Sequence, residues 1–477
     1  MIARKLRASM GAAVWLPRLR PTRSTDRQPV GMREGVGVND GSVRLAPRHQ
    51  PLGPARRADR GDGGDRQPPV RVDAFTGPLT QHYHVSLAAV QVAFSAFVLT
   101  ETWLVPAEGY LIDRLGPRVV LIVGGVLVGL GWLGPGLWAP NVQAVIAWYA
   151  LGGVGAGAVY GGSIGSAIKW FPDRRGLATG LVAGAYGVGT ALTVAPVAAM
   201  IKANGYAYAF VFWGIVQGLI VVVAAMFVTH PPRDYVPQGW DPRQSRQTAV
   251  RISGREFNPL QMIRQPTFWV LYVMMTMMAF TGLVVTVQIS PIASYYHVGN
   301  VPLVFGFTAL VLALELDRVV NGVTRPLWGW ISDRVGRENA MFVSFSLQAV
   351  SIVAWIGLLG NPIWFVVFSG LAYFGWGNIF SLFPATVGDL FGRRYATTNY
   401  GLMYTSKGLA SILSGPVVAL VAQQFKGNWT PVFWAMAVSS AIPALMALLW
   451  LKPITRRAVS GRDQAEEGTV VPMNPAT

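Results

Sequence analysis

The chain of 477 residues is 52% hydrophobic and only 13% charged, with a mean hydropathy of +0.40. This balance is typical of a protein with many membrane helices and argues against a soluble enzyme. The net charge of +17 does not indicate nucleic acid, because its excess of Arg and Lys lies in a leader and in short loops between apolar runs. The absence of Cys excludes a disulfide framework.

Residues 1–72 form a basic leader of low complexity. Residues 1–71 hold 14 Arg and 1 Lys against 6 acidic residues, and Arg, Pro, Gly and Asp interrupt every window. We expect no membrane helix there, since an Arg at the bilayer centre costs about 2.5 to 3.5 kcal/mol. Two interpretations stay open: a wrongly framed or wrongly started translation, or a natural disordered basic tail.

Eleven apolar runs long enough to cross a bilayer follow the leader. Loops rich in Arg and Lys fall on one side of these runs by alternation, whereas the opposite loops carry Lys202 and Lys426 as their clear cations. The positive-inside rule therefore places the basic loops and the C-terminus in the cytoplasm, for a multi-pass chain in the inner membrane. The runs lie near 86–110, 118–138, 142–168, 177–202, 207–229, 267–290, 304–330, 340–360, 363–388, 398–422 and 431–451.

A polar connector at 230–266 separates two helical bundles at 73–229 and 267–452, and a cytoplasmic tail follows at 453–477. The two bundles repeat each other at an offset of 220 residues. This offset indicates a duplicated bundle of membrane helices. The clearest matches are Gly109, Asp113 and Arg114 with Gly329, Asp333 and Arg334, and Pro106 and Pro196 with Pro326 and Pro416.

The offset also predicts a partner for the run 267–290 at 47–70. That stretch belongs to the leader and is too rich in Pro, Arg, Gly and Asp to cross a bilayer. One helix of the duplicated unit is therefore expected to be missing.

The repeated Gly-x-x-x-Asp-Arg-x-Gly loops resemble the signature of the major facilitator superfamily. Four further segments resemble the oxalate/formate antiporter family: Thr100–Glu108, Asp317–Pro326, Trp376–Pro384 and Asn399–Gly408. The resemblance covers about 75–452 and fails over the first helix, where the family carries a Gln-Tyr pair. It implies an all-α membrane protein with two pseudo-symmetric bundles, eleven recognisable helices of an expected twelve, and alternating access.

Arg325 is the first candidate for binding a substrate. Four positions recur at three- to four-residue spacing and share one helical face: Glu315, Arg318, Asn321/Gly322 and Arg325. Ionisable groups at membrane depth normally turn such a face toward a cavity or a partner. The planar fork of Arg325 suits a carboxylate. The alternatives for Arg325 are a pair with Glu101 or a place in a gate, and for Arg318 we prefer an internal pair with Glu315.

Lys407 is the second candidate. It lies near the middle of the run 398–422 and needs an anion there, which is either an Asp or Glu of a neighbouring helix or a substrate that brings the charge. Arg325 and Lys407 together complement a small dicarboxylate. We therefore predict that both bind substrate.

The resemblance also implies an aromatic lining of the substrate site and a cytoplasmic gate. Spacing alone leaves ordinary packing open for the aromatic residues, and Phe380 departs from the Tyr usual at its place. Gln91 is a weaker candidate for a polar contact. The predicted lining is Tyr160, Tyr186, Trp376, Phe380 and Tyr404, and the predicted gate is Gly109, Asp113, Arg114, Gly329, Asp333 and Arg334. For the gate, a solvated loop with charges at helix ends is the alternative.

The glycine-rich run 152–162 lies inside an apolar helix with no preceding strand, so we interpret it as a site of close helix packing and not as a dinucleotide loop. The five His form no metal-ligand cluster, and we expect no cofactor, no metal and no enzymatic activity.

The sequence thus predicts a secondary antiporter of the inner membrane, surrounded by lipid and acting as a monomer. Its partners are small carboxylate anions, oxalate against formate as the family implies, and not nucleic acid. Two alternatives stay open: a proton-coupled monocarboxylate carrier with Glu101 and Glu108 as its proton sites, and a transport-incompetent product that lacks the first helix.

Overall fold

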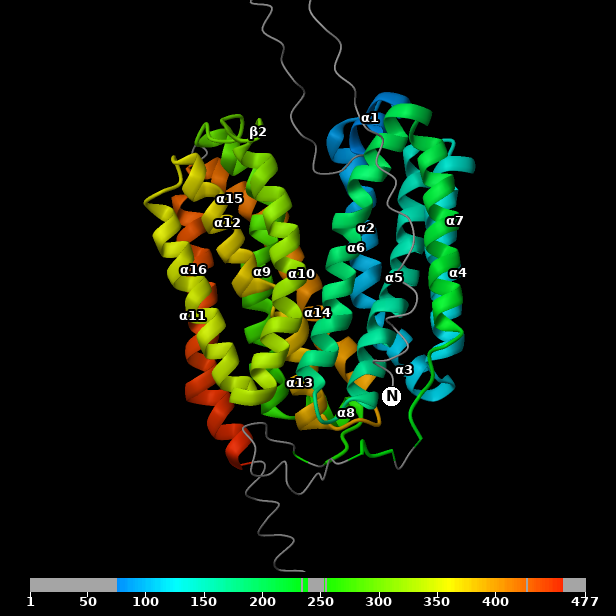
Figure 1. Ribbon diagram of the computed structural model, residues 1–477, viewed down its shortest axis with the longest axis vertical. Coiled ribbons are helices and arrows are strands. Elements are labelled where there is room, and N and C mark those ends of the chain that lie inside the picture. Colours follow the sequence, from blue (N-terminus) through cyan, green and yellow to red (C-terminus); the bar gives the residue numbers. More distant parts are fainter. Residues whose placement is uncertain (1–74, 233–234, 239–252, 254, 426–427, 458–477) are drawn as a thin grey trace, which may run out of the picture. The chain divides into compact units, whose positions relative to one another are not determined.

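The computed structural model describes residues 75–232, 235–238, 253, 255–425 and 428–457, and these residues are almost entirely helical (Figure 1). The leader lies outside the described residues, and so does the prediction that it holds no membrane helix. The N-terminal bundle contains α1 (Thr76–Tyr83), α2 (Leu87–Trp103), α3 (Val105–Leu115), α4 (Pro117–Leu137), α5 (Val142–Trp170), α6 (Arg175–Asn204) and α7 (Tyr206–Ala225).

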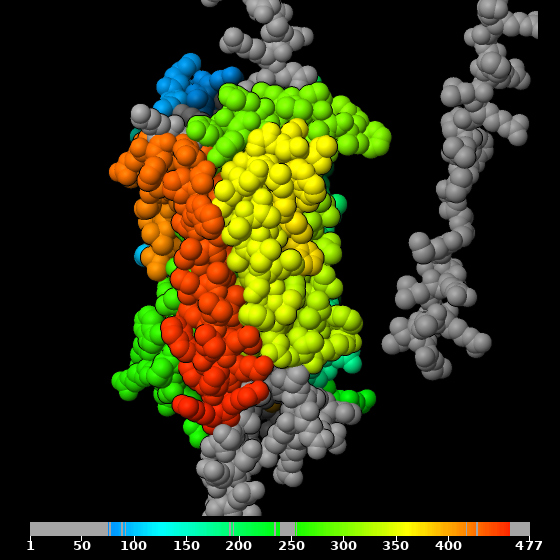
Figure 2. All heavy atoms as spheres, turned by 90° about the vertical axis from the view of Figure 1, so that its left-hand side faces the viewer, coloured from blue at the N-terminus to red at the C-terminus, as the bar shows by residue number. Residues whose placement is uncertain are grey.

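The C-terminal bundle begins with the short α8 (Pro259–Ile263) and the long α9 (Pro266–Tyr295). Figure 2 shows α16 (Thr430–Met446, red) beside α11 (Arg337–Ile356, yellow) on one face of this bundle. The remaining elements are β1 (Pro302–Val304), β2 (Phe307–Thr308), α10 (Ala309–Val335), α11 (Arg337–Ile356), α12 (Pro362–Trp376), α13 (Ile379–Phe391), α14 (Ala396–Ile412), η2 (Leu413–Val417), α15 (Val418–Gln424), α16 (Thr430–Met446) and η3 (Ala447–Leu451).

Every predicted apolar run is helical in the structure. Among the described residues, eight helical segments are long and apolar enough to cross a membrane by length and composition. Helices α2, α6 and α10 fall outside this set, and α10 does so because it carries Glu315, Asp317, Arg318 and Arg325 within its length. All-α membrane architecture is therefore confirmed.

Three predicted runs differ in detail from the helices that they become, and one of them, 363–388, is divided between α12 and α13 at Gly377 and Asn378. The run 86–110 is divided at Leu104, because Pro106 has no N–H to donate and its ring crowds the preceding turn. The run 304–330 begins as a helix only at Ala309, since β1 and β2 first form an antiparallel hairpin that turns at Gly306, where φ is 79°.

Close backbone approach holds the N-terminal bundle together. A Cβ placed on Gly155 would lie 2.4 Å from the carbonyl oxygen of Gly124, and one on Gly131 would lie 2.4 Å from the Cα of Gly152. Helices α4 and α5 can approach this closely only without side chains at these positions. The interpretation of the glycine-rich run as a packing site is confirmed.

Corresponding helices of the two bundles are buried to different extents. In the most apolar stretch of α7, 17% of the residues are buried, whereas 56% are buried in the corresponding stretch around α16. In the C-terminal bundle α9 packs against both α14 and α16. The counterpart of α9 at the 220-residue offset would be residues 46–75, nearly all of which lie outside the described part of the chain.

Candidate functional site

Arg325 is a buried cation in the interior of α10. Its side chain donates to Asn321 Oδ1 from Nε at 3.3 Å and from Nη2 at 3.0 Å, and Nη1 donates to the carbonyl of Ala183 at 2.7 Å. Arg325 is 5% exposed, and no carboxylate lies within ion-pair distance of it in the described part of the chain. The alternative pair with Glu101 is therefore not formed, and the guanidinium has neutral oxygens as its partners.

Lys407 of α14 has an internal anion. Its Nζ lies 3.3 and 3.2 Å from the two carboxylate oxygens of Glu101 on α2, and it donates to the Tyr404 hydroxyl at 2.8 Å. The same hydroxyl donates to Glu101 Oε1 at 3.0 Å. Of the two anions considered for Lys407, the structure thus supplies the carboxylate of a neighbouring helix.

Phe380 brings the two cations together. The guanidinium carbon of Arg325 lies 4.4 Å from the centroid of the Phe380 ring, and Lys407 Nζ lies 5.9 Å from it. An aromatic face attracts cations through its quadrupole. The two predicted substrate-binding cations therefore line one site.

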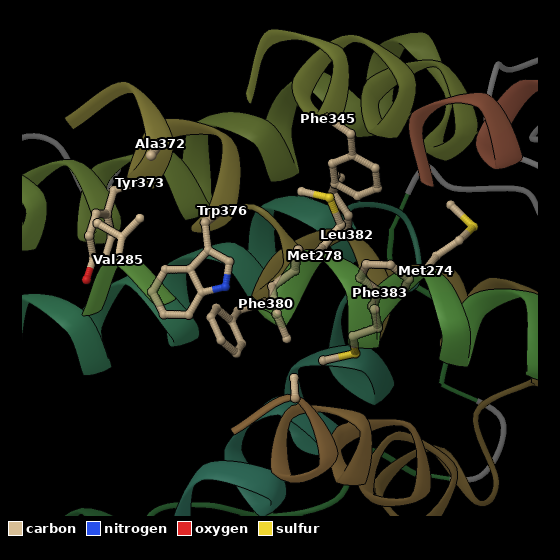
Figure 3. Close-up of a cluster of buried hydrophobic side chains, with 14 of the residues drawn as sticks. Met274, Met278, Val285, Phe345, Ala372, Tyr373, Trp376, Phe380, Leu382 and Phe383 are labelled. Carbon is tan, nitrogen blue, oxygen red and sulfur yellow. The ribbon is translucent and has the colours of Figure 1, made fainter. Parts of the chain in front are cut away.

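The predicted aromatic residues surround these cations. Trp376 packs edge-on against Phe380 with ring centroids 5.4 Å apart, and Figure 3 shows both rings within the buried cluster of the C-terminal bundle. The Tyr160 ring is tilted against the Tyr404 ring with centroids 5.1 Å apart. It packs edge-on against the Tyr186 ring with centroids 5.3 Å apart. Rings from both bundles thus form one continuous group.

Two other candidates lie apart from this group or are not described. Arg318 donates to Glu315 Oε1 at 2.8 Å, so the preferred internal pair is confirmed. The side chain of Gln91 lies outside the described residues, and its predicted contact stays a prediction.

The repeated aspartates tie the bundles together at one end, which we call the aspartate end and define by Asp113, Asp333 and Asp389. Asp113 accepts from Lys169 Nζ at 2.6 Å within its own bundle. Across the interface it accepts from the backbone N–H and the hydroxyl of Thr398 at 2.9 and 2.7 Å. A carboxylate at the first turn of α14 is favourably placed toward the helix dipole.

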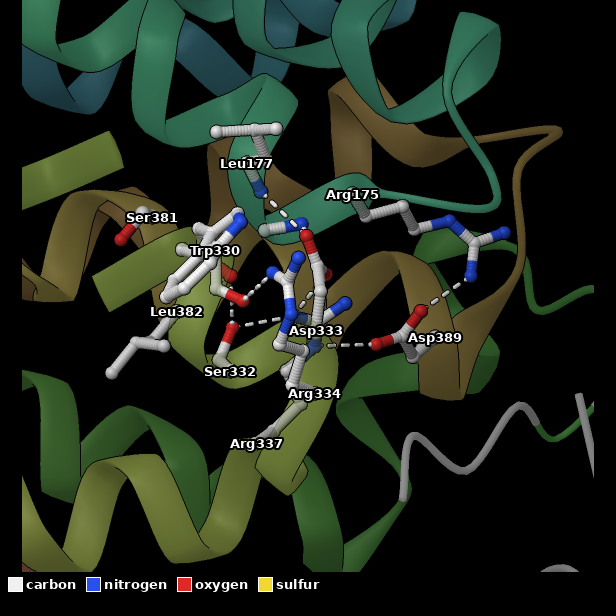
Figure 4. A network of polar contacts seen from close by, with 12 residues as sticks. Arg175, Leu177, Trp330, Ser332, Asp333, Arg334, Arg337, Ser381, Leu382 and Asp389 are labelled. Atoms are coloured by element: carbon white, nitrogen blue, oxygen red, sulfur yellow. Dashed lines mark hydrogen bonds and ion pairs between the residues drawn. The ribbon is translucent and has the colours of Figure 1, made fainter. Parts of the chain in front are cut away.

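Asp333 makes the pseudo-symmetric contact. It accepts from the backbone N–H groups of Gly176 and Leu177, at the start of α6, at 3.0 and 2.8 Å (Figure 4). A Cβ on Gly329 would lie 2.0 Å from the Gly176 carbonyl oxygen, and one on Gly109 would lie 2.8 Å from the Thr397 backbone. The two glycines of the repeated motif therefore let the bundles come close enough for the two aspartates of the motif to contact the opposite bundle.

Arg114 and Arg334, the arginines of the repeated motif, contact aromatic rings of their own helices. Each guanidinium lies over a ring of its own helix, Arg114 at 4.6 Å from the Tyr110 centroid and Arg334 at 3.7 Å from the Trp330 centroid. In the described part of the chain, their contacts lie within their own helices.

Asp389 of α13 completes the aspartate end and was not among the predicted residues. It accepts from Arg175 Nη1 at 2.5 Å and from Arg337 Nε at 2.8 Å, and Arg337 Nη1 also donates to Asp333 at 2.7 Å (Figure 4). All three side chains of this triad are nearly fully buried. A signal existed in the sequence, because Asp389 falls on Lys169 at the 220-residue offset and thus marks an ionisable position in both halves.

His230, after α7, extends the cluster around Asp113. Its Nε2 lies 3.2 Å from Lys169 Nζ and 3.1 Å from the carbonyl oxygen of Ile112. Burial and the neighbouring Lys169 ammonium lower the pKa of the His230 imidazole. A neutral imidazole leaves Lys169 free to hold Asp113.

A family model described as the Major Facilitator Superfamily matches residues 74–316 and 316–475 of the chain. The chain belongs to the major facilitator superfamily. Within the superfamily, it is 32% identical over 375 residues to the oxalate:formate antiporter of Oxalobacter formigenes, an alignment that covers 78% of this chain and 85% of that protein. The resemblance to the oxalate/formate antiporter family is confirmed.

Further proteins similar to this chain include a curated relative and two solved structures. The MFS-type transporter YhjX of Escherichia coli K12 is 26% identical over 345 residues, covering 71% of this chain and 80% of that protein. Among solved structures, the proton:xylose symporter XylE has a TM-score of 0.61 at 13% identity, covering 79% of this chain and 91% of that one. The human organic anion transporter MFSD10 has a TM-score of 0.57 at 15% identity, covering 78% and 88%. Both structures support the superfamily fold.

Proposed function

We propose that this major facilitator exchanges small carboxylate anions across the inner membrane by alternating access, with oxalate against formate as the favoured pair. The observation that carries the proposal is Arg325, a buried guanidinium with no carboxylate beside it in the described residues. An unpaired buried charge is costly, and a substrate carboxylate would complete it with two parallel hydrogen bonds. The 32% identity to the oxalate:formate antiporter supports the choice of substrates.

Lys407 and the aromatic residues complete the proposed site. Lys407 faces the same Phe380 ring as Arg325, so the second carboxylate of a dicarboxylate would reach it. Trp376, Tyr160 and Tyr404 enclose the anion in a low-dielectric lining, in which each charge interaction is stronger than in water.

The aspartate end is proposed to face the cytoplasm, because the loops that carry most Arg and Lys lie there. Asp113 and Asp333 would then close the cytoplasmic side as gate residues while the site is open to the other side. The bound anion offsets the unpaired positive charge of the site and permits the bundles to rock, and this accounts for exchange.

Exchange can be measured with purified protein in proteoliposomes. We expect uptake of labelled oxalate into vesicles loaded with formate or unlabelled oxalate, and little uptake into vesicles loaded with chloride, because an empty site would retain its unpaired cation. Rapid uptake of monocarboxylate into chloride-loaded vesicles under an inward proton gradient would instead support the proton-coupled carrier.

Phe380→Tyr tests whether this ring lines the substrate site. The added hydroxyl would supply a hydrogen-bond donor worth about 0.5 to 1.5 kcal/mol net, and we expect oxalate to exchange with a half-saturating concentration about 2- to 12-fold lower. Phe383→Tyr, within the same buried cluster, is the matched control. An unchanged half-saturating concentration for Phe380→Tyr would assign Phe380 to packing alone.

A further inference from the structure

Glu101 is placed where it competes with a substrate. It is 3% exposed, it lies on α2 of the N-terminal bundle, and its carboxylate holds Lys407 of the C-terminal bundle. The substrate proposed above needs the same ammonium group. The second carboxylate of a dicarboxylate would therefore meet the Glu101 carboxylate at a single ammonium group, whereas a monocarboxylate on Arg325 would not.

The charges of the empty site can be counted. Arg325 and Lys407 contribute two positive charges, and Glu101 contributes one negative charge. The empty site therefore carries a net charge of +1. A bound monocarboxylate neutralises this site completely. A bound dicarboxylate leaves an excess negative charge in a buried place, unless Glu101 takes up a proton and releases Lys407.

The groups that face Glu101 support this count. Lys407 and Tyr404 of α14 contact it directly, the Tyr160 ring of α5 packs against Tyr404, and the Tyr186 ring of α6 packs against Tyr160. Glu108 of α3 is the remaining ionisable neighbour. The cation within reach of Glu101 in the described residues is Lys407, so a displaced Glu101 carboxylate finds no second one there.

Glu108 supplies neither a positive charge nor a hydrogen bond to the Glu101 carboxylate among the described residues. Both of its carboxyl oxygens are buried without a hydrogen-bond partner among the described residues. A Cβ on Gly157 would lie 2.7 Å from the Glu101 carbonyl oxygen and 2.9 Å from Glu108 Oε2, so the two residues share one crowded wall. We count Glu108 as neutral, because an isolated buried carboxyl group holds its proton.

We propose that Glu101 determines which charge of anion the site accepts. With Glu101 ionised and bound to Lys407, the site fits a monocarboxylate on Arg325. With Glu101 protonated, both cations are free and the site fits a dicarboxylate. This proposal rests on the proposed function, since it assumes that carboxylates bind at Arg325 and Lys407.

Binding of labelled oxalate, with formate as the competitor, tests the proposal in purified protein from about pH 6 to about pH 8, where both substrates stay fully ionised. In the unmodified protein, the affinity for oxalate relative to formate should rise as pH falls. In Glu101→Gln the ratio at pH 8 should be about tenfold or more above that of the unmodified protein, because the negative charge of Glu101 no longer lies beside the dianion. The ratio should not vary with pH, since Gln has no proton to gain or lose in this range. Glu315→Gln, which changes an exposed carboxylate paired with Arg318, should leave the ratio unchanged.

The outcomes separate the two proposals. If the unmodified protein binds neither anion, the proposed function fails and this inference fails with it. If Glu101→Gln changes both affinities by the same factor, or if the unmodified ratio is independent of pH, Glu101 only ties the bundles together. The charge proposal is then overturned and carboxylate transport stands.

Discussion

Arg325→Gln should reduce oxalate exchange in proteoliposomes by about 30-fold or more, since removing one partner of a buried charge pair costs about 2 to 5 kcal/mol. Arg325→Lys should fail almost as completely. It retains the positive charge but loses the planar fork, and a lysine cannot donate to Asn321, Ala183 and a carboxylate in the geometry that Arg325 uses. Initial rates of exchange, normalised to the amount of protein inserted, measure the effect.

Arg318→Gln is the matched control for this prediction. Arg318 lies on the same helix, two turns from Arg325, and its guanidinium is already paired with Glu315. We expect it to retain most of its exchange activity. Full activity in Arg325→Gln would show that the carboxylate binds elsewhere.

Asp389→Ala should be strongly destabilising. It leaves the buried guanidinium groups of Arg175 and Arg337 without the carboxylate that both share. Breaking a buried ion pair from one side costs about 3 to 5 kcal/mol, so we expect a clear fall in the melting temperature of the purified protein. Asp389→Asn should be milder, because the amide oxygen still accepts one hydrogen bond.

Asp173→Ala provides the comparison for Asp389→Ala. Asp173 pairs at 3.5 Å with Arg174, whose side chain is 71% exposed, and such surface pairs contribute about 0 to 1 kcal/mol. The two melting temperatures can be followed side by side by tryptophan fluorescence in detergent. Equal melting temperatures for the two variants would mean that the triad is not a stabilising element.

The helices could be predicted from the sequence because each apolar run needs about twenty residues to cross a bilayer. The 220-residue offset relates Asp113 to Asp333, and in the structure both contact the start of a helix in the opposite bundle. Arg325 and Phe380 were predicted from helical spacing and family resemblance, and the structure brings them together.

The partners of the charged groups could not be predicted in the same way. Whether Lys407 pairs with Glu101 depends on how α14 packs against α2 across the bundle interface, and periodicity within one helix carries no information about that packing. The triad of Asp389 was missed for the same reason, since Arg175 lies more than 200 residues away in the chain. The division of the helix at Leu104 was missed because Pro326, the counterpart of Pro106, lies inside an unbroken α10.

The contacts of Asp113 and Asp333 bear on the proposed alternating-access cycle. Each carboxylate binds N–H groups at the start of a helix of the other bundle, and such charge–dipole contacts are worth about 0.3 to 2 kcal/mol. Water can replace each of these hydrogen bonds where the bundles part, so these contacts by themselves would hold the aspartate end only weakly. A change of about 5.5 kcal/mol in differential binding moves a two-state population from 1:99 to 99:1. The buried pair of Arg175 and Asp389 spans the same interface, so it accounts for a larger part of the free energy that a bound anion would have to offset in the proposed cycle.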